Sequence, residues 1–143
     1  MPIILTQTDT TVGFLSQDAS KLFEIKSRPK TKPFLKVYNS LLTFKKDFKR
    51  IPSSHKKSFR RAKKMTFVIK NQAVRIAPFT LNSQYFKTIC WQYSTSANES
   101  GKDFNRLFCE EKSDIIIENR KRLFETNSSK IYKINNNKKR RLR

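Results

Sequence analysis

The chain has 143 residues, 36% of them hydrophobic and 12% aromatic, which is enough to bury the core of one compact domain. Its 32 Lys and Arg against 11 Asp and Glu give a formal net charge of +21, which indicates an anionic partner such as nucleic acid, a nucleotide or an acidic membrane surface. Two glycines are too few for a Walker phosphate loop or a dinucleotide-binding turn, and two cysteines with one histidine exclude a structural zinc site.

The pattern of apolar and polar residues predicts strands that alternate with helices. In chain order we expect a strand at 3–5, a loop at 6–13, a helix at 19–25 capped by Asp18, a strand at 33–38, a helix at 39–48, a basic helix capped by Ser53 or Ser54 and ending at Arg61, strands at 65–69 and 73–77, a helix at 82–89, a strand at 91–94, a helix at 103–111, and strands at 114–117 and 130–134. Residues 135–143 are low in complexity and could form a flexible basic tail or a final strand. The alternation favours a single α/β domain on a mixed sheet.

The apolar runs are far shorter than the roughly 20 residues that a membrane-spanning helix needs. Residues 1–6 also lack the basic start and the long apolar stretch of a signal peptide. We therefore expect a cytoplasmic protein with no membrane partner, in which Cys90 and Cys109 stay reduced. The single histidine, His55, lies among serines and lysines, and we expect it on the surface and not in a catalytic triad.

The positive charge is concentrated in two blocks of the sequence. Residues 21–70 hold 17 Lys and Arg against two acidic residues, and residues 126–143 hold seven against none. A lysine-rich surface explains the number of cations, but it does not explain the scarcity of acids in the first block. This distribution predicts an electropositive surface near a polyanion site, without assigning a role to any single lysine.

Two loops rich in hydroxyl groups follow apolar strands, and each contains one of the two glycines. The first runs from Thr8 to Gly13 and the second from Ser94 to Gly101. Open α/β sheets bind ligands at the ends of their strands, where hydroxyl and amide side chains can hold carboxylate and phosphate oxygens. The segment Lys26–Pro33 adds several cations behind the first helix, suited to the oxygens of a triphosphate. Turn chemistry or the helix dipole would account for any one of these features alone.

Taken together and in this order, Thr8-Asp9-Thr10, Lys26-x-Arg28-Pro29 and the segment from Ser94 to Gly101 resemble the YrdC/TsaC family of threonylcarbamoyl-AMP synthases. The resemblance covers nearly the whole chain. It extends to Met65-Thr66-Phe67-Val68-Ile69, Ala73-Val74-Arg75-Ile76, Ser129-Lys130-Ile131 and Leu142-Arg143. It implies a YrdC-like α/β domain over residues 1–137, with a twisted mixed sheet and flanking helices. Residues 138–143 would be a basic C-terminal end or the last strand of the same domain.

The resemblance also implies an activity and a set of site residues. The activity is a nucleotidyl transfer that joins threonine, bicarbonate and ATP with Mg²⁺ into threonylcarbamoyl-AMP and pyrophosphate, for modification of tRNA by downstream threonylcarbamoyl-transfer proteins. The implied site has no protein-bound metal. Its catalytic residues are Lys26 and Arg28; its ATP ligands are Lys26, Arg28, Lys32, Ser96, Asn98 and Arg143; its threonine ligands are Thr8, Thr10, Arg75, Ser94 and Ser129. We expect the charged groups of Lys26 and Arg28 to face solvent.

The chain departs from the family pattern at several positions. Gln7 and Val12 replace the Pro and Tyr of the first motif, and Val37 occupies the position of a histidine. These departures favour an alternative function, an RNA-binding protein of the same fold without synthase activity. In that protein, residues 45–64 and 138–143 would contact the phosphates of tRNA or rRNA. Lys26, Arg28, Ser96 and Asn98 favour the synthase.

Overall fold

The computed structural model describes residues 1–48, 51–77 and 83–143, so Asn82 of the helix expected at 82–89 lies outside the described residues. The strands are β1 (Ile4–Gln7), β2 (Val12–Ser16), β3 (Leu35–Tyr38), β4 (Met65–Ile69), β5 (Gln72–Ile76), β6 (Trp91–Ser96), β7 (Ile115–Ile117), β8 (Lys130–Ile134) and β9 (Lys139–Arg141). The helices are α1 (Ala19–Lys26), α2 (Leu41–Phe48), the 3-10 turn η1 (Ser53–His55), α3 (Lys56–Arg61), α4 (Ser83–Ile89) and α5 (Arg106–Glu111).

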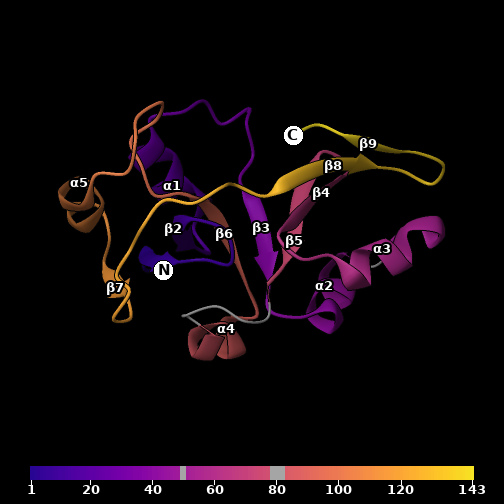
Figure 1. Cartoon of the computed structure of the whole chain (residues 1–143), viewed down its shortest axis with the longest axis horizontal. Helices are drawn as coiled ribbons and strands as arrows, with labels where there is room; N and C mark the ends of the chain where they lie inside the picture. Colours follow the sequence, from indigo (N-terminus) through magenta and orange to yellow (C-terminus); the bar gives the residue numbers. More distant parts are fainter. Residues whose placement is uncertain (49–50, 78–82) are drawn as a thin grey trace.

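The described strands form one mixed sheet in the order β7-β1-β2-β6-β3-β5-β4-β8-β9. Three neighbouring pairs are parallel, namely β1 with β7, β3 with β5 and β4 with β8, and the other pairs are antiparallel. Figure 1 shows the twisted sheet crossing the molecule, with α1 and α5 beside one half and α2 and α3 beside the other. The expected α/β class and mixed sheet are confirmed.

The register of the strands divides the core between the two faces of the sheet. Tyr93, Val74 and Phe67 occupy equivalent positions in successive strands, and Phe14 is paired with Thr95, two residues from Tyr93. These side chains therefore point to one face, called the first face. The helices α1 and α5 pack on one half of this face, and α2 and α3 pack on the other half. The second face carries Ile4, Leu15 and Val37, against which Ile89 of α4 packs.

Aromatic rings fill the core between the first face and the helices α2 and α3. Phe44 stacks on Phe59 with ring centroids 4.8 Å apart, and Phe59 stacks on Phe67 of β4 at the same separation. The ring of Tyr38 contacts that of Phe44 edge-on at 5.2 Å. Such a chain of buried rings explains why helices of only eight and six residues stay fixed to the sheet, because short helices gain little stability on their own.

Local signals in the sequence place α1 correctly. The Asp18 side chain accepts a hydrogen bond from the Ser20 backbone N–H at 2.9 Å, which caps the first turn. Ser27 adopts a left-handed conformation with φ of 45° and ends the helix two residues before Pro29. Of the expected apolar face, Leu22 is fully buried, whereas Phe23 and Ile25 are half-buried.

The loop expected at 6–13 is wrong in part, because these residues form the tight turn of a β-hairpin. Thr6 and Gln7 continue β1, Val12 and Gly13 begin β2, and the Thr8 N–H donates to the Thr11 carbonyl at 3.2 Å. A Cβ on Gly13 would lie 3.0 Å from the Thr8 side chain and 3.1 Å from the Thr95 carbonyl oxygen. Glycine is therefore needed here for the close approach of β2 to β6.

Two other expectations need correction near α3. Neither Ser53 nor Ser54 caps the basic helix; the segment Ser53–His55 forms a 3-10 turn that leads directly into α3. His55 is buried, with 9% of its surface exposed, and its Nε2 atom has no hydrogen-bond partner among the described residues. The surrounding lysines had predicted a surface position, but the 3-10 turn directs the ring inward.

The C-terminal residues pair with the sheet. Lys139–Arg141 form β9, which is antiparallel to β8 with Tyr132 opposite Arg141. The Leu142 N–H then donates to the Ile131 carbonyl at 2.7 Å, so the pairing extends past the end of the strand. In Figure 1 the C-terminus lies near the sheet at the end of the β8–β9 hairpin. None of the described helices has the length and apolar character needed to cross a membrane.

Candidate functional site

A cavity of about 350 Å³ lies on the second face of the sheet. Arg75 and Ala73 of β5 alternate with Val74, which is buried in the core of the first face, so they point to the opposite side. Thr66 lies on the neighbouring strand β4, and Ser94 lies on β6 on the other side of β3; both line the cavity. The walls are completed by the β1–β2 turn, the segment after α1, the residues before β8 and the end of the chain.

The cavity brings together most of the site residues expected from the sequence. Those that line it are Thr8, Thr10, Arg28, Arg75, Ser94, Ser96, Ser129 and Arg143. Those that do not line it are Lys26, Lys32 and Asn98. The eight lining residues are separated by up to 135 positions in the sequence, so the fold brings them together. Three of them are arginines and five carry hydroxyl groups, which makes this set polar and cationic.

Arg75 is the most buried cation of the cavity wall, with 4% of its side chain exposed. Its Nη2 atom lies 3.0 Å from Oδ1 of Asp9 in the β1–β2 turn. Burial lowers the pKa of Arg75 from its ordinary value, and the neighbouring Asp9 carboxylate opposes that shift. Asp9 is thus a site residue that the sequence reasoning missed. The signal for it was a charged residue inside the otherwise apolar strand Ala73-Val74-Arg75-Ile76, which requires a buried counter-ion.

We expected Lys26 to face solvent, but it is buried, with only 5% of its surface exposed. Its Nζ atom donates to the Ser96 carbonyl at 3.0 Å, to the Asn98 carbonyl at 2.7 Å and to Oδ1 of Asn98 at 2.7 Å. The Ser96 hydroxyl donates to the same Oδ1 at 2.7 Å. Lys26 therefore anchors the loop after β6, and a role as a phosphate ligand stays a prediction.

We expect this buried ammonium to titrate near neutral pH. Burial, with a smaller contribution from Arg28, lowers the pKa of Lys26 from 10.5 to about 8. Below pH 8 the buried charge therefore reduces the stability of the fold, and this cost falls as the pH rises from about 8 toward 10.5. Above pH 8 the neutral amine keeps only two N–H donors for its three acceptors.

Nuclear magnetic resonance of the lysine side chains measures this titration. One Cε resonance is expected to titrate with a pKa of about 8, to disappear in Lys26→Met, and to persist in the control Lys21→Met on the same helix. A Lys26 resonance that titrates near the ordinary value of 10.5 would show that the ammonium is not held in the loop as described.

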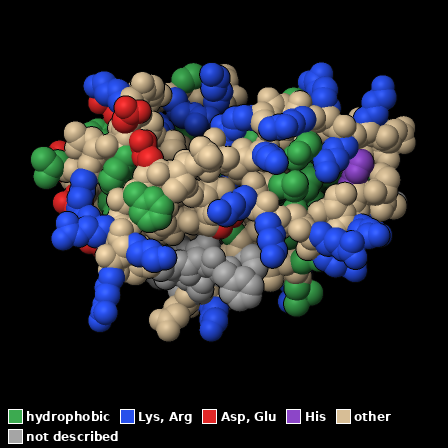
Figure 2. Space-filling model, viewed as in Figure 1, with side chains coloured by type: hydrophobic (Ala, Val, Ile, Leu, Met, Phe, Trp, Pro, Cys, Tyr) green, Lys and Arg blue, Asp and Glu red, His purple; other side chains and the backbone are tan. Residues whose placement is uncertain are grey.

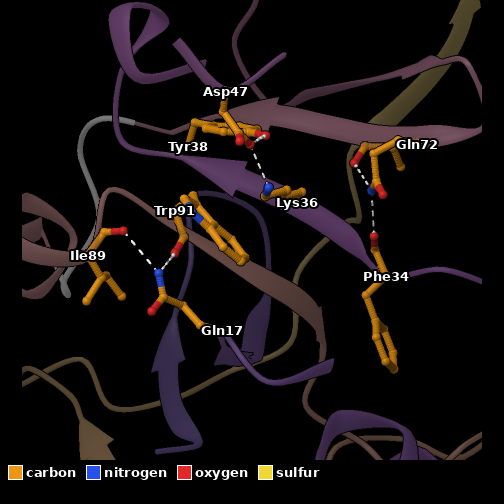
Figure 3. A network of polar contacts seen from close by, with 9 residues as sticks. Gln17, Phe34, Lys36, Tyr38, Asp47, Gln72, Ile89 and Trp91 are labelled. Carbon is orange, nitrogen blue, oxygen red and sulfur yellow. Dashed lines mark hydrogen bonds and ion pairs between the residues drawn. The ribbon is translucent and has the colours of Figure 1, made fainter. Parts of the chain in front are cut away.

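Arg28 lies at the edge of the cavity and is held by backbone and ring contacts. Its Nη2 atom donates to the Lys32 carbonyl at 2.8 Å, and its guanidinium carbon lies 4.7 Å from the centre of the Phe34 ring. Phe34 is itself fixed, since Nε2 of Gln72 donates to its carbonyl at 2.9 Å (Figure 3). The side chain of Lys32 is exposed, so its ammonium does not reach the cavity wall.

Two buried guanidinium donors of the site lack a protein partner. The Nε atoms of Arg28 and Arg75 are both buried, and neither has a hydrogen-bond partner among the described residues. Buried N–H donors are nearly always satisfied in folded proteins, because an unpaired donor costs free energy. Both residues line the cavity, so two guanidinium groups contribute to its wall.

The hydroxyl groups on the other side of the cavity are linked to the C-terminus. Oγ1 of Thr66 and Oγ of Ser129 are 2.7 Å apart, and Nε and Nη2 of Arg143 both donate to the Ser129 carbonyl at 3.2 Å. Oγ1 of Thr8 lies 3.2 Å from that of Thr10 across the turn. Thr66, which was not among the expected ligands, belongs to the same set because it faces the cavity from β4.

The segment before β8 is tied to the β1–β2 turn. Oε1 of Gln7 accepts from the Phe124 N–H at 3.1 Å, and the Thr126 hydroxyl donates to the Thr10 carbonyl. The Thr126 N–H donates to Oγ1 of Thr11 at 3.1 Å. Gln7, one of the departures from the family pattern, thus holds the chain that brings Ser129 to the cavity.

A polar network on the first face fixes β3, the strand next to the cavity. The Lys36 ammonium donates to Oδ2 of Asp47 in α2 at 2.6 Å and lies 3.8 Å from the centre of the Trp91 ring. The Tyr38 hydroxyl donates to the same oxygen at 2.5 Å, and Figure 3 shows the three groups converging there. The Lys36 and Tyr38 hydrogen bonds lower the pKa of Asp47.

A second cavity, of about 620 Å³, lies between α3 and β5, and its described lining includes Leu41, Phe59 and Ile76. Arg60 to Lys64 and Asp9 border it. It holds none of the eleven residues expected from the sequence. The smaller cavity on the second face is therefore the candidate site.

No family model matches this sequence, and no curated protein matches it. Solved structures do match over 99% of the chain. Sua5 of P. abyssi complexed with L-threonine is 19% identical with a TM-score of 0.77, and the chain covers 50% of it. The protein MTH1692 of Methanobacterium thermoautotrophicum is 19% identical with a TM-score of 0.71, and the chain covers 79% of it.

A third structure, HypF in a phosphate- and nucleotide-bound form, is 14% identical with a TM-score of 0.71, and the chain covers 26% of it. The chain spans about half the length of the Sua5 structures that it matches. At these identities the comparisons establish the fold, and the expected YrdC-like fold is confirmed.

Proposed function

We propose that this chain is a threonylcarbamoyl-AMP synthase, which joins threonine, bicarbonate and ATP and releases pyrophosphate. The observation that carries the proposal is the cavity on the second face, because it gathers eight of the residues expected from the family resemblance. The proposal is also supported by the fold, which the chain shares with a Sua5 structure complexed with L-threonine and with a nucleotide-bound form of HypF.

The lining residues divide into two groups that suit the two substrates. Arg28 and Arg143 provide guanidinium groups for the phosphates of ATP, since a planar fork can bind two oxygens at once. Arg75 provides a buried positive charge for the carboxylate of threonine. The hydroxyls of Thr8, Thr10, Ser94 and Ser129, which also line the cavity, can bind the amine and the hydroxyl of the amino acid.

The remaining expected ligands take supporting parts in this proposal. Lys26 and Asn98 fix the loop that presents the Ser96 hydroxyl to the nucleotide. Lys32 approaches the phosphates from the solvent side, beside Arg28. Lys26 is therefore assigned as a positioning residue, and Arg28 as the cation that contacts the reacting phosphate.

The reaction requires two anions to meet in line. The threonine amine and bicarbonate give a carbamate with loss of water, and a carbamate oxygen then attacks the α-phosphorus of ATP. The bond from that phosphorus to the bridging oxygen breaks, and pyrophosphate leaves with the electron pair. The arginines lower the repulsion between carbamate and triphosphate, so that positioning and charge neutralisation supply the catalysis and no histidine base is needed.

Mg²⁺ fits the site as a companion of the triphosphate. The described residues contain no group of three or more metal-ligating side chains, none of the lining residues is an Asp or Glu, and the Asp9 carboxylate is paired with Arg75. Magnesium in phosphoryl-transfer sites is commonly held by substrate phosphates and water, with few protein ligands. The ion would supply further charge neutralisation on the phosphates.

If the protein makes this product, it takes part in tRNA modification, which we propose to occur in the cytoplasm. Threonylcarbamoyl-AMP is an activated acyl group, so it requires a second protein that transfers the threonylcarbamoyl group to an adenosine of tRNA. The partners in this proposal are therefore threonine, bicarbonate, ATP, tRNA and downstream transfer proteins.

Pyrophosphate release tests the proposed activity. The assay contains ATP, Mg²⁺ and bicarbonate with threonine, with serine, or with no amino acid. Release is expected with threonine and should be much weaker with serine, which lacks the methyl group. Release that is independent of the amino acid would show an ATP pyrophosphohydrolase, and no release in any mixture would contradict the synthase.

A further inference from the structure

The second cavity, of about 620 Å³, lies beside α3 at the end of the sheet where β5 ends and the antiparallel strand β4 begins. Its described apolar lining comes from α2, from α3 and the residue after it, and from the end of β5. The residues are Leu41, Phe59, Ala62, Ile76 and Ala77. Close-packed cores leave few voids larger than a water molecule, so a cavity of this size is more than a packing defect. Its volume lies in the range of small-molecule binding sites.

Four cations border this apolar lining. They are Arg60 and Arg61 in the last turn of α3, and Lys63 and Lys64 in the turn that leads into β4. All four are exposed. Figure 2 shows Lys and Arg side chains gathered at the end of the molecule that carries α3, whereas most Asp and Glu side chains of that view lie at the opposite end. The cavity thus combines an apolar interior with a positively charged rim.

The charges of this rim have no counter-ion among the described residues. The ion pairs of the described part of the chain involve other cations. The sequence has no Asp or Glu between Asp47 and Glu99. Asp9 is the one carboxylate in the described lining, and it contacts the Arg75 guanidinium at 3.0 Å. Its charge is therefore compensated by Arg75 and does not neutralise the rim.

Cations at the opposite end of the molecule do have acidic partners. Arg106 of α5 contacts Glu110 at 2.6 Å and Glu118 at 2.8 Å, and Lys102 contacts Glu99 at 2.6 Å. The lysine-rich composition thus does not by itself leave cations without counter-ions. A cluster of unpaired cations beside an apolar cavity indicates a ligand that carries both an acidic group and an apolar body.

We propose that the second cavity binds a small amphipathic anion, an acyl or alkyl chain that ends in a carboxylate or a phosphate, at a site separate from the proposed synthase site. The chain packs against Leu41 and Ile76, and the acidic group meets Arg61 and Lys63 at the rim. The Phe59 ring already stacks on two other rings of the core. The aliphatic side chains therefore provide the contact surface, which favours an aliphatic chain over a flat aromatic ligand.

Nuclear magnetic resonance of the methyl groups tests this proposal on the full chain. Octanoate is added while the methyl resonances of Leu41 and Ile76 are followed. Octanol provides the same chain without the charge, inorganic phosphate provides a charge without the chain, and octyl phosphate replaces the carboxylate by a phosphate. The methyl groups of Leu107 and Ile115 serve as references, because they are exposed on α5 and β7 at the opposite end of the molecule (Figure 1).

Octanoate, octyl phosphate or both are expected to shift the resonances of Leu41 and Ile76 and to leave the two references unchanged. Octanol should bind more weakly, since it lacks the acidic group, and inorganic phosphate alone should not shift these methyl resonances. The comparison of octanoate with octyl phosphate then shows which acidic group the rim prefers.

Two double variants lose the same charge from the same helix region. Arg61→Gln/Lys63→Gln removes two rim cations and is expected to weaken octanoate binding by about 10-fold, comparable to the loss of one hydrogen bond to a charged group. Lys56→Gln/Lys57→Gln is the matched control, because both lysines are exposed on α3 and do not line the cavity. Ala62→Phe places a ring in the cavity and is expected to abolish the methyl shifts. The proposed synthase site contains none of these residues, so the test is independent of that assignment.

Unchanged Leu41 and Ile76 resonances with every ligand would overturn the proposal. Octanol that binds as tightly as octanoate, or equal losses in the two double variants, would also overturn it, because the rim would then make no specific contribution. Displacement of octanoate by ATP or by an RNA hairpin would assign the cavity to a nucleotide or a nucleic acid instead. Shifts caused by vesicles of an anionic phospholipid but not by octanoate would assign it to a membrane lipid.

Discussion

Replacing Asp9 with alanine is expected to destabilise the protein by about 3–5 kcal/mol, because it leaves the buried Arg75 guanidinium without a counter-ion. Arg75 is 4% exposed and contacts Asp9 at 3.0 Å. The reverse change, Arg75→Met, is expected to cost less, since the Asp9 side chain is 16% exposed and can be hydrated. Urea unfolding followed by circular dichroism measures both differences.

The double variant Asp9→Ala/Arg75→Met separates stability from function. It removes both charges, so it is expected to be more stable than Asp9→Ala alone. It should nevertheless lack threonine-dependent pyrophosphate release, because the positive charge assigned to the threonine carboxylate is gone. A loss of less than 1 kcal/mol in Asp9→Ala would show that the pair does not support the cavity wall.

Replacing Arg28 with alanine is expected to lower the rate of pyrophosphate release by about 100-fold to 1000-fold, comparable to the loss of one preorganised donor at a reacting centre. Arg28 lines the cavity, and its buried Nε atom has no partner among the described residues. Its other contacts are exposed hydrogen bonds to the Lys32 and Pro33 carbonyls and the Phe34 ring, so the change in stability should stay near 1 kcal/mol. Steady-state kinetics measures the loss of pyrophosphate release, and urea unfolding measures the change in stability.

Arg28→Lys is the matched variant for this position. Lysine keeps the positive charge but lacks the planar fork, so it is expected to recover only part of the activity. Lys30→Ala serves as the control, because Lys30 is exposed in the same segment and does not line the cavity. Wild-type turnover in Arg28→Ala would remove Arg28 from the site, whereas equal losses in Arg28→Ala and Lys30→Ala would indicate a general effect of surface charge.

The parts of the fold that depend on local signals could be predicted from the sequence. The Asp18 cap and the polar break before Pro29 located α1, and the β-branched residues of 65–69 and 73–77 located the β4–β5 hairpin. The strand β2 was missed because its five residues are all buried, so the sequence shows no alternation there. The threonines before β2 and its Gly13 are typical of a loop. The strand is recognised only from its pairing with β6, which is a long-range contact.

The parts of the site that depend on long-range packing could not be predicted in the same way. The motifs identified eight residues that line the cavity, and their order in the chain matched the family pattern. The ion pair between Asp9 and Arg75 and the burial of Lys26 against the loop after β6 join residues at least 66 positions apart. Neither the hydrophobic periodicity of the sequence nor its local propensities can predict such contacts. The burial of His55 was missed for the same reason, because the lysines beside it are exposed while the ring turns inward.

The central claim is the formation of the threonylcarbamoyl-adenylate, and isotope incorporation tests it most directly. The protein is incubated with ATP, Mg²⁺, threonine and ¹³C-bicarbonate, and the nucleotide products are separated and weighed by mass spectrometry. The account predicts a nucleotide heavier than AMP by the threonylcarbamoyl group, which carries the ¹³C label and is absent when threonine or bicarbonate is omitted. AMP without the label, or unchanged ATP, would contradict the assignment of this cavity as a synthase site.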